Sequence, residues 1–310
     1  MKIWTNVKYD DATLALLRAE TGGHELTFAP ADAFAVEADI LYGQPPLEVI
    51  ERAAKLRWLH VDTAGYERYD NDALRADLQQ RSIAFTNSSS VFAEPCAQHL
   101  LALMLGLARC IPQSVTNQDG ARDWPMMPLR AETILLNGQT AVLLGYGAIA
   151  RRLVELLTPF EMRLVALRRQ ARGDESIPVI SERELPTALA QADHVINILP
   201  GGPATRQFVN ADVLDALKPG ARFYNIGRGG TVDQDALLSA LQRGTLGAAY
   251  LDVTDPEPLP PEHALWRAPN CFITPHTGGG HHNERERQAR HFLTNLQRFV
   301  AGEALLDRVV

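Results

Sequence analysis

Cysteine is scarce in this chain of 310 residues, which contains only Cys96, Cys110 and Cys271. The three are widely spaced, odd in number and form no Cys-x-x-Cys pair, which argues against a disulfide framework. We interpret them as buried thiols in a reducing compartment. The sequence also starts directly with a short apolar stretch and no long hydrophobic region, so no secretory signal is predicted and we expect a cytoplasmic protein.

Long hydrophobic runs and an excess of positive charge are also absent. No segment approaches the roughly 18 apolar residues that a membrane span needs. A net charge of −7 argues against a protein that binds the phosphate backbone of nucleic acids. The remaining composition, 46% hydrophobic and 22% charged, is ordinary for a soluble protein of two domains. We therefore expect neither a membrane nor a nucleic acid among its partners.

Short apolar runs alternate with helix-compatible segments along the whole chain, which is typical of βαβ units and a parallel sheet. A first series of expected strands lies at 3–4, 38–42, 56–60 and 82–86. A second series of six lies at 140–144, 163–167, 194–198, 221–226, 246–251 and 271–274. Six is the number that a dinucleotide fold of two mononucleotide halves requires. The expected fold class is α/β, with two Rossmann-like or flavodoxin-like parallel-sheet domains and a cleft between them.

Helix signals and the two series together suggest the domain limits. The Leu- and Ala-rich segment 96–108 predicts a buried helix between domains. Further helices are expected at 148–157, at 211–217 after the N-cap Asn210, from Asp233 to about Gly244, and at 283–300. We expect a substrate domain formed by residues 1–97 and 278–310, and a dinucleotide-binding domain formed by residues 98–277.

Two glycines follow the first strand of the second series. Gly145 permits a tight turn, and Gly147 lets the backbone approach a phosphate without a Cβ in the way. The helix from Ala148 would point its N-terminal amides at that anion. The alternative is an ordinary strand-to-helix turn. In the dinucleotide interpretation, the cofactor-binding residues here are Gly145, Tyr146, Gly147, Ala148 and Ile149.

The end of the next strand indicates which dinucleotide binds. An NAD site usually has an acidic residue there, about 20 residues beyond the glycines, to bind the ribose 2′-hydroxyl. This chain has Arg168 instead, followed by Arg169 and Arg172. Arginines suit the 2′-phosphate of NADP, so NADP is preferred over NAD as the cofactor. A solvated basic loop is the alternative interpretation.

Three further segments follow strands, where an open α/β sheet binds its ligands. They are residues 225–230 (NIGRGG), 251–258 (LDVTDPEP) and 274–279 (TPHTGG). In this order, and together with the glycine turn, they closely resemble the D-isomer-specific 2-hydroxyacid dehydrogenase family, in particular its glyoxylate and hydroxypyruvate reductases. The resemblance covers most of the chain and is weaker before Ala93.

The resemblance implies a catalytic triad. Arg228 would bind the carboxylate and carbonyl oxygen of a 2-oxo acid, for which a permanently charged fork of donors is suited. His276 would protonate the carbonyl oxygen in reduction and act as the base in the reverse direction. Glu257 would pair with His276 and favour its imidazolium form. The backbone of Ala64 and Gly65 would also bind the substrate carboxylate.

The family pattern also implies further cofactor contacts. Asp252 resembles the residue that holds the nicotinamide carboxamide. The remaining expected cofactor residues are Leu199, Pro200, Thr205, Ile226, Gly227, His276 and Gly278.

The other histidines are interpreted as surface or core residues. His281 and His282 lack further ligands at metal spacing and are interpreted as surface residues, so no metal is expected. His99, within the long apolar segment, is interpreted as a satisfied core histidine.

The expected function is reduction of a small 2-oxo acid by NADPH in a homodimer. Phosphoglycerate oxidation and a dinucleotide-sensing regulator on the same fold are the alternatives.

Overall fold

The computed structural model describes residues 1–28, 30 and 33–310. The chain forms two compact units, Met1–Phe92 with Gly280–Val310, and Ala93–Gly279. From the sequence, the divisions were expected after residues 97 and 277. In the structure they follow Phe92 and Gly279, and both positions of the first division lie within the long helix α5 (Ser89–Ala108), which begins before the expected start at residue 96.

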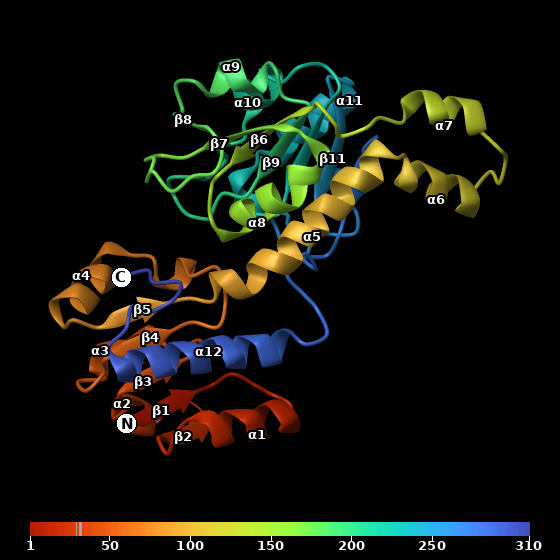
Figure 1. The fold of residues 1–310 in the computed structure, drawn as a ribbon. Coiled ribbons are helices and arrows are strands. Elements are labelled where there is room, and N and C mark those ends of the chain that lie inside the picture. Colours follow the sequence, from red (N-terminus) through yellow and green to blue (C-terminus); the bar gives the residue numbers. More distant parts are fainter. Residues whose placement is uncertain (29, 31–32) are drawn as a thin grey trace. The chain divides into compact units, whose positions relative to one another are not determined.

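Unit 1 contains a sheet of five parallel strands in the order β2-β1-β3-β4-β5 (Figure 1). This is the flavodoxin-like order of strands. The strands are β1 (Lys2–Thr5), β2 (Glu25–Phe28), β3 (Ile40–Tyr42), β4 (Trp58–His60) and β5 (Ala84–Thr86). The sequence analysis missed β2, an edge strand with no fully buried residue that therefore lacks the apolar run of its neighbours.

Helices surround this sheet, and the C-terminal helix belongs to its core. They are α1 (Asp11–Glu20), α2 (Ala33–Val36), α3 (Leu47–Arg52), η1 (Glu67–Tyr69), α4 (Asp72–Gln80) and α12 (Glu284–Ala301). Phe292 of α12 stacks on Tyr42 and Trp58, with ring centroids 4.1 and 5.3 Å apart. The last residues then pair with β5, where Val309 donates its N–H to the carbonyl of Phe85 at 2.8 Å.

Unit 2 contains a sheet of seven parallel strands in the order β12-β11-β10-β9-β6-β7-β8. The strands are β6 (Thr140–Leu144), β7 (Arg163–Leu167), β8 (Val179–Ile180), β9 (His194–Asn197), β10 (Ala221–Asn225), β11 (Leu246–Leu251) and β12 (Cys271–Ile273). The order is the Rossmann one with one added strand, and its direction reverses between β6 and β9. Six strands lie where they were expected, and only the two-residue β8 was missed.

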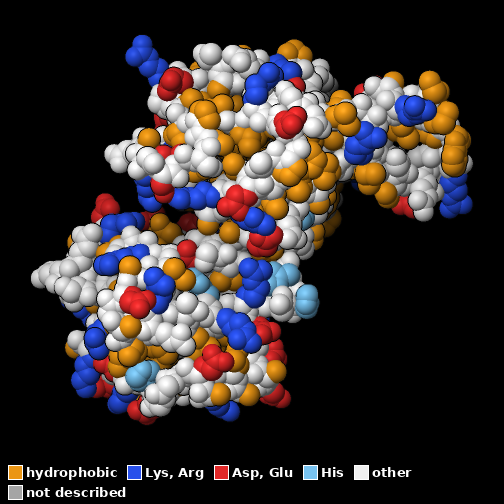
Figure 2. All heavy atoms as spheres, in the orientation of Figure 1, with side chains coloured by type: hydrophobic (Ala, Val, Ile, Leu, Met, Phe, Trp, Pro, Cys, Tyr) orange, Lys and Arg blue, Asp and Glu red, His pale blue; other side chains and the backbone are white. Residues whose placement is uncertain are grey.

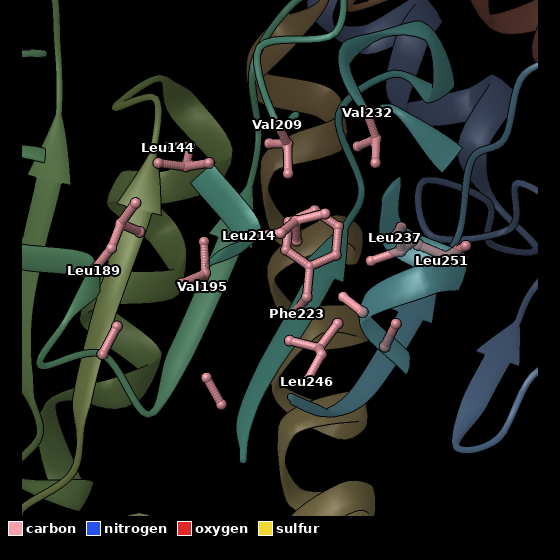
Figure 3. Close-up of a cluster of buried hydrophobic side chains, with 14 of the residues drawn as sticks. Leu144, Leu189, Val195, Val209, Leu214, Phe223, Val232, Leu237, Leu246 and Leu251 are labelled. Atoms are coloured by element: carbon pink, nitrogen blue, oxygen red, sulfur yellow. The ribbon is translucent and has the colours of Figure 1, made fainter. Parts of the chain in front are cut away.

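Apolar side chains from this sheet pack with those of its helices. Phe223 of β10 is fully buried and lies among Val195, Leu237 and Leu246 (Figure 3). The helices are α5, α6 (Ile111–Asp119), α7 (Met126–Glu132), α8 (Ala148–Leu157), η2 (Thr158–Phe160), α9 (Leu185–Leu189), α10 (Ala211–Asp215), η3 (Gly229–Thr231), α11 (Gln234–Gln242) and η4 (Ala264–Arg267). Asn210 and Asp233 cap α10 and α11 as expected.

Two features of unit 2 were not expected. Helices α6 and α7 project from the rest of unit 2, and neither helix contains a buried residue. Hydrophobic side chains gather on this projection (Figure 2). Within the described part of the chain, α5 alone is long and apolar enough to cross a membrane. A core helix of a soluble protein meets the same criterion, and Leu100 and Met104 of α5 are fully buried.

Candidate active site

The turn after β6 requires glycine at its first position. Gly145 adopts φ +103°, in a region that favours glycine, and a Cβ on it would lie 3.1 Å from the carbonyl oxygen of Ile198. The chain therefore passes directly over the end of β9, at the point where the order of strands reverses. Ala150, the small residue of the third position, is fully buried.

The helix that follows this turn suits an anion. Gly147 is the N-cap of α8 and has no side chain to satisfy the first backbone amides. The space that a Cβ on Gly147 would occupy is open. Helix N-termini without a side-chain cap bind phosphate through these amides and the positive end of the helix dipole. The residues present therefore fit a dinucleotide pyrophosphate.

Arg168 follows β7, as expected, but it is paired with an acidic residue that the sequence analysis did not consider. Its Nη1 atom lies 2.6 Å from Glu175 Oε1 and 3.5 Å from Asp174 Oδ1. The side chains of Arg168 and Glu175 are only 13% and 6% exposed. Glu175 also accepts the backbone N–H groups of Arg172 and Gly173 at 2.8 and 2.9 Å. These bonds, that of Arg172 first, lower the pKa of the Glu175 carboxyl.

Glu175 accepts hydrogen bonds from Arg168 and Arg172, which line a basic hollow. A cavity of about 440 Å³ is lined by Arg168, Arg169, Gln170 and Arg172. Since Glu175 engages one nitrogen of Arg168, the other guanidinium donors remain for a ligand. Nearby, the hydroxyl of Tyr146 lies 2.9 Å from that of Ser176, which joins the glycine turn to the segment after Glu175.

The loops after β9 and β10 lie against each other next to the glycine turn. Thr205 donates its hydroxyl proton to the carbonyl of Pro200 at 2.6 Å. A Cβ on Gly227 would lie 2.5 Å from the carbonyl oxygen of Leu199, so only glycine fits there. Ile226 is 6% exposed and lies against Gly278. Six of the expected cofactor residues are thus brought together at one edge of the sheet.

Arg228 is positioned by a network at the end of β10. Its carbonyl accepts the hydroxyl of Thr231 at 2.6 Å and the amide of Asn225 at 3.3 Å. The next residue, Gly229, packs so closely that a Cβ on it would overlap the carbonyl of Thr254. The loop of Arg228 therefore lies directly against the segment that leads to Glu257.

Glu257 and His276 form a hydrogen-bonded pair. His276 Nδ1 lies 2.7 Å from Glu257 Oε1, and the two side chains are 50% and 42% exposed. A carboxylate on Nδ1 orients the imidazole and leaves Nε2 on the opposite side of the ring for another group. The backbone N–H of His276 donates to the carbonyl of Asp252 at 2.9 Å. An imidazole oriented by a carboxylate in this way can act as a general acid.

Asp252 is deeply buried, with its side chain 1% exposed. Its carboxylate accepts the hydroxyl of Thr274 at 2.7 Å and the backbone N–H groups of Thr277 and Gly278 at 2.9 and 3.0 Å. Asp252 therefore also holds the loop that carries His276, besides the cofactor role implied by the resemblance.

The expected carboxylate-binding loop belongs to unit 1. Asn87 donates to the carbonyl of Ala64 at 2.8 Å, and Thr63 donates to that of Gly65 at 2.6 Å. Among the residues that the structure describes, the backbone N–H groups of Ala64 and Gly65 donate to no protein group. These two N–H groups have the chemistry that a carboxylate requires.

The remaining histidines do not form a metal centre within the described ranges, where no cluster of three or more His, Cys, Asp or Glu is placed to hold an ion. His281 Nδ1 lies 2.7 Å from Asn283 Oδ1, and His282 is exposed. His99 was interpreted from the sequence as a satisfied core histidine, and its Nε2 lies 3.2 Å from the Thr274 hydroxyl. No local pattern marks that contact, because it joins residues 175 positions apart.

Comparisons with known proteins agree with this geometry. Residues 101–278 match the family described as D-isomer specific 2-hydroxyacid dehydrogenase, NAD binding domain. The human glyoxylate reductase/hydroxypyruvate reductase is 32% identical over 74% of this chain and 70% of its own. A D-isomer specific 2-hydroxyacid dehydrogenase from Xanthobacter autotrophicus Py2, solved with NADPH and MES, has a TM-score of 0.84 and 25% identity, and covers 100% of this chain and 98% of its own.

A second solved structure has a more specific description. The NADPH-dependent glyoxylate/hydroxypyruvate reductase of Sinorhizobium meliloti, in complex with citrate, has a TM-score of 0.75 and 28% identity, and covers 100% of this chain and 97% of its own. With the family match spanning more than half of the sequence, the chain belongs to the D-isomer specific 2-hydroxyacid dehydrogenases, a family of oxidoreductases.

Proposed function

We propose that this protein reduces a small 2-oxo acid to the D-2-hydroxy acid with NADPH, and that glyoxylate or hydroxypyruvate is the substrate. The observation that carries the proposal is the His276–Glu257 pair at 2.7 Å. It lies on loops from the same sheet edge as the Arg228 loop and the glycine turn. A proton donor, a cation and a nucleotide site are what this reduction needs.

Each of these residues has a defined role in the proposed reaction. Arg228 holds the carboxylate of the 2-oxo acid and polarises its carbonyl oxygen. His276 gives its Nε2 proton to that oxygen as the C2 carbon is reduced, while Glu257 stabilises the imidazolium before transfer. When bound, the reduced nicotinamide supplies the hydride. Ala64 and Gly65 bind the substrate carboxylate through their N–H groups.

The basic hollow after β7 supports NADP rather than NAD as the preferred cofactor. Arg168, Arg169 and Arg172 line it, and a 2′-phosphate carries the charge that these arginines would bind. Two solved relatives are described with NADPH. NAD remains the alternative cofactor, since Glu175 lies within reach of the same position.

Turnover tests the proposal. Purified protein is mixed with NADPH and, in turn, glyoxylate, hydroxypyruvate, pyruvate and phosphohydroxypyruvate, and NADPH absorbance is followed. We expect the first two to give the highest kcat/KM. Absence of NADPH oxidation with every acid would refute the reductase function, and a preference for phosphohydroxypyruvate would refute the substrate assignment.

The projection of α6 and α7 supports a homodimer. Six of the nine large hydrophobic side chains that are exposed among the described residues lie in or beside it, and these are Ile111, Val115, Trp124, Met126, Met127 and Leu135. Trp124 is 89% exposed, and such a patch usually marks a protein interface. We expect sedimentation to give twice the chain mass, and the double variant Trp124→Ser with Met127→Ser to weaken association. A monomeric wild type would contradict the proposal.

Three unpaired thiols favour the cytoplasm as the location of the protein.

A further inference from the structure

A histidine outside the proposed triad contacts the loop that carries His276. His99 lies on α5, in the part of that helix that belongs to unit 2. Its Nε2 atom lies 3.2 Å from the hydroxyl oxygen of Thr274 and 3.5 Å from Asp252 Oδ1. The His99 side chain is 20% exposed, and the Asp252 carboxylate beside it is almost completely buried.

The directions of these hydrogen bonds determine which nitrogen of His99 carries a proton. Thr274 donates its only hydroxyl proton to Asp252 Oδ1 at 2.7 Å. Its oxygen can therefore only accept from His99, so Nε2 is protonated. The three side chains form a chain of donors that runs from His99 through Thr274 to Asp252. Each bond in such a buried chain polarises the next and restrains the groups to one geometry.

Asp252 transmits this restraint to the catalytic loop. It accepts the backbone N–H groups of Thr277 and Gly278, which follow His276 directly. Its own backbone carbonyl accepts the N–H of His276. His276 adopts φ +52°, in the left-handed region that non-glycine residues rarely occupy and that surrounding contacts must maintain. Gly278 also lies beside His99, since a Cβ built on it would be 3.2 Å from the imidazole.

We propose that His99 is a positioning residue, which acts through Thr274 and Asp252 to hold His276 where its proton reaches the substrate oxygen. This inference rests on the proposed function of His276 as the acid in 2-oxo acid reduction. A displacement of about 1 Å at a reacting group lowers a rate by about a hundredfold. Loss of the His99 hydrogen bond therefore lowers kcat more than it weakens the binding of NADPH or of the 2-oxo acid.

Two variants of His99 test the role. His99→Leu keeps most of the volume and removes the donor, whereas His99→Gln keeps an N–H donor toward Thr274. His282→Leu, which changes an exposed histidine, is the matched control. The rate is expressed per bound NADPH, counted by cofactor fluorescence, so that a smaller folded fraction does not affect it. We expect kcat per site to fall about ten- to a hundredfold in His99→Leu, to recover in His99→Gln and to stay unchanged in the control.

A second measurement does not depend on turnover. Hydrogen exchange of the Thr277 and Gly278 amides, followed by mass spectrometry, should quicken in His99→Leu and return to the wild-type rate in His99→Gln. If His99→Leu does not fold, Thr274→Val removes the same bridge from the loop side. An unchanged kcat per site or unchanged exchange overturns the inference. Exchange that behaves as expected in a protein that reduces no 2-oxo acid contradicts the proposed function instead.

Discussion

Replacing Arg168 with alanine should reverse the cofactor preference. The guanidinium is 13% exposed and lies at the edge of the basic hollow, where one nitrogen is bound to Glu175. The others are expected to donate to the 2′-phosphate of NADPH. A charge-assisted hydrogen bond contributes about 1.5–3 kcal/mol, and about 1.4 kcal/mol corresponds to a factor of ten. Loss of the Arg168 donor should therefore lower kcat/KM for NADPH about ten- to a hundredfold.

The change for NADH should be small, because NADH has no 2′-phosphate. Glu175 would remain in place through the N–H groups of Arg172 and Gly173, and its uncompensated charge would repel the phosphate further. The assay is steady-state kinetics with both cofactors at a fixed concentration of 2-oxo acid, and Arg183→Ala, at an exposed arginine outside the hollow, is the control. Equal losses for NADPH and NADH, or a wild type that prefers NADH, would refute the reasoning.

Other predictions follow from the same contacts. His276→Gln should lower kcat about 10²- to 10⁴-fold, the usual contribution of a general acid, and Glu257→Gln should lower it less; equal kcat values in the wild type and His276→Gln would contradict this. Gly229→Ala should lower the free energy of unfolding by about 1–3 kcal/mol, since its Cβ would overlap Thr254; a wild-type Tm would contradict it. Burial lowers the pKa of His194 to about 3, against about 6.5 in the unfolded chain. The unfolded chain then binds more protons between these values, so stability should fall by about 1.4 kcal/mol per pH unit below pH 6.5. Urea unfolding should show a weaker pH dependence in His194→Gln, and an equal dependence would refute this.

The centre of the second sheet could be predicted closely because β6 and β9 are buried on both faces. Residues 140–144 are all buried, and such continuous apolar runs are distinctive. Helix α8 was expected at 148–157 and has those bounds, since the glycines before it mark its start. The two missed strands were an edge strand and a two-residue strand. Neither buries enough surface to leave a pattern in the sequence.

The contacts around the candidate site were harder to predict. The loops of Arg228, Glu257 and His276 could be located from motifs that follow strands. The pairing of Arg168 with Glu175 depends on how the intervening loop folds back. The contact of His99 with Thr274 is between residues far apart in the sequence, so a lone histidine in an apolar segment indicated only a buried site. No helix was predicted within residues 109–135, and neither α6 nor α7 contains a buried residue.

The configuration of the product tests the central claim most directly. The protein is incubated with hydroxypyruvate and NADPH, and the glycerate formed is separated by chiral chromatography beside a reaction with His276→Gln. We expect the wild type to form D-glycerate in amounts equal to the NADPH consumed, and the variant to form almost none. L-glycerate, no glycerate, or equal amounts from the variant would contradict it.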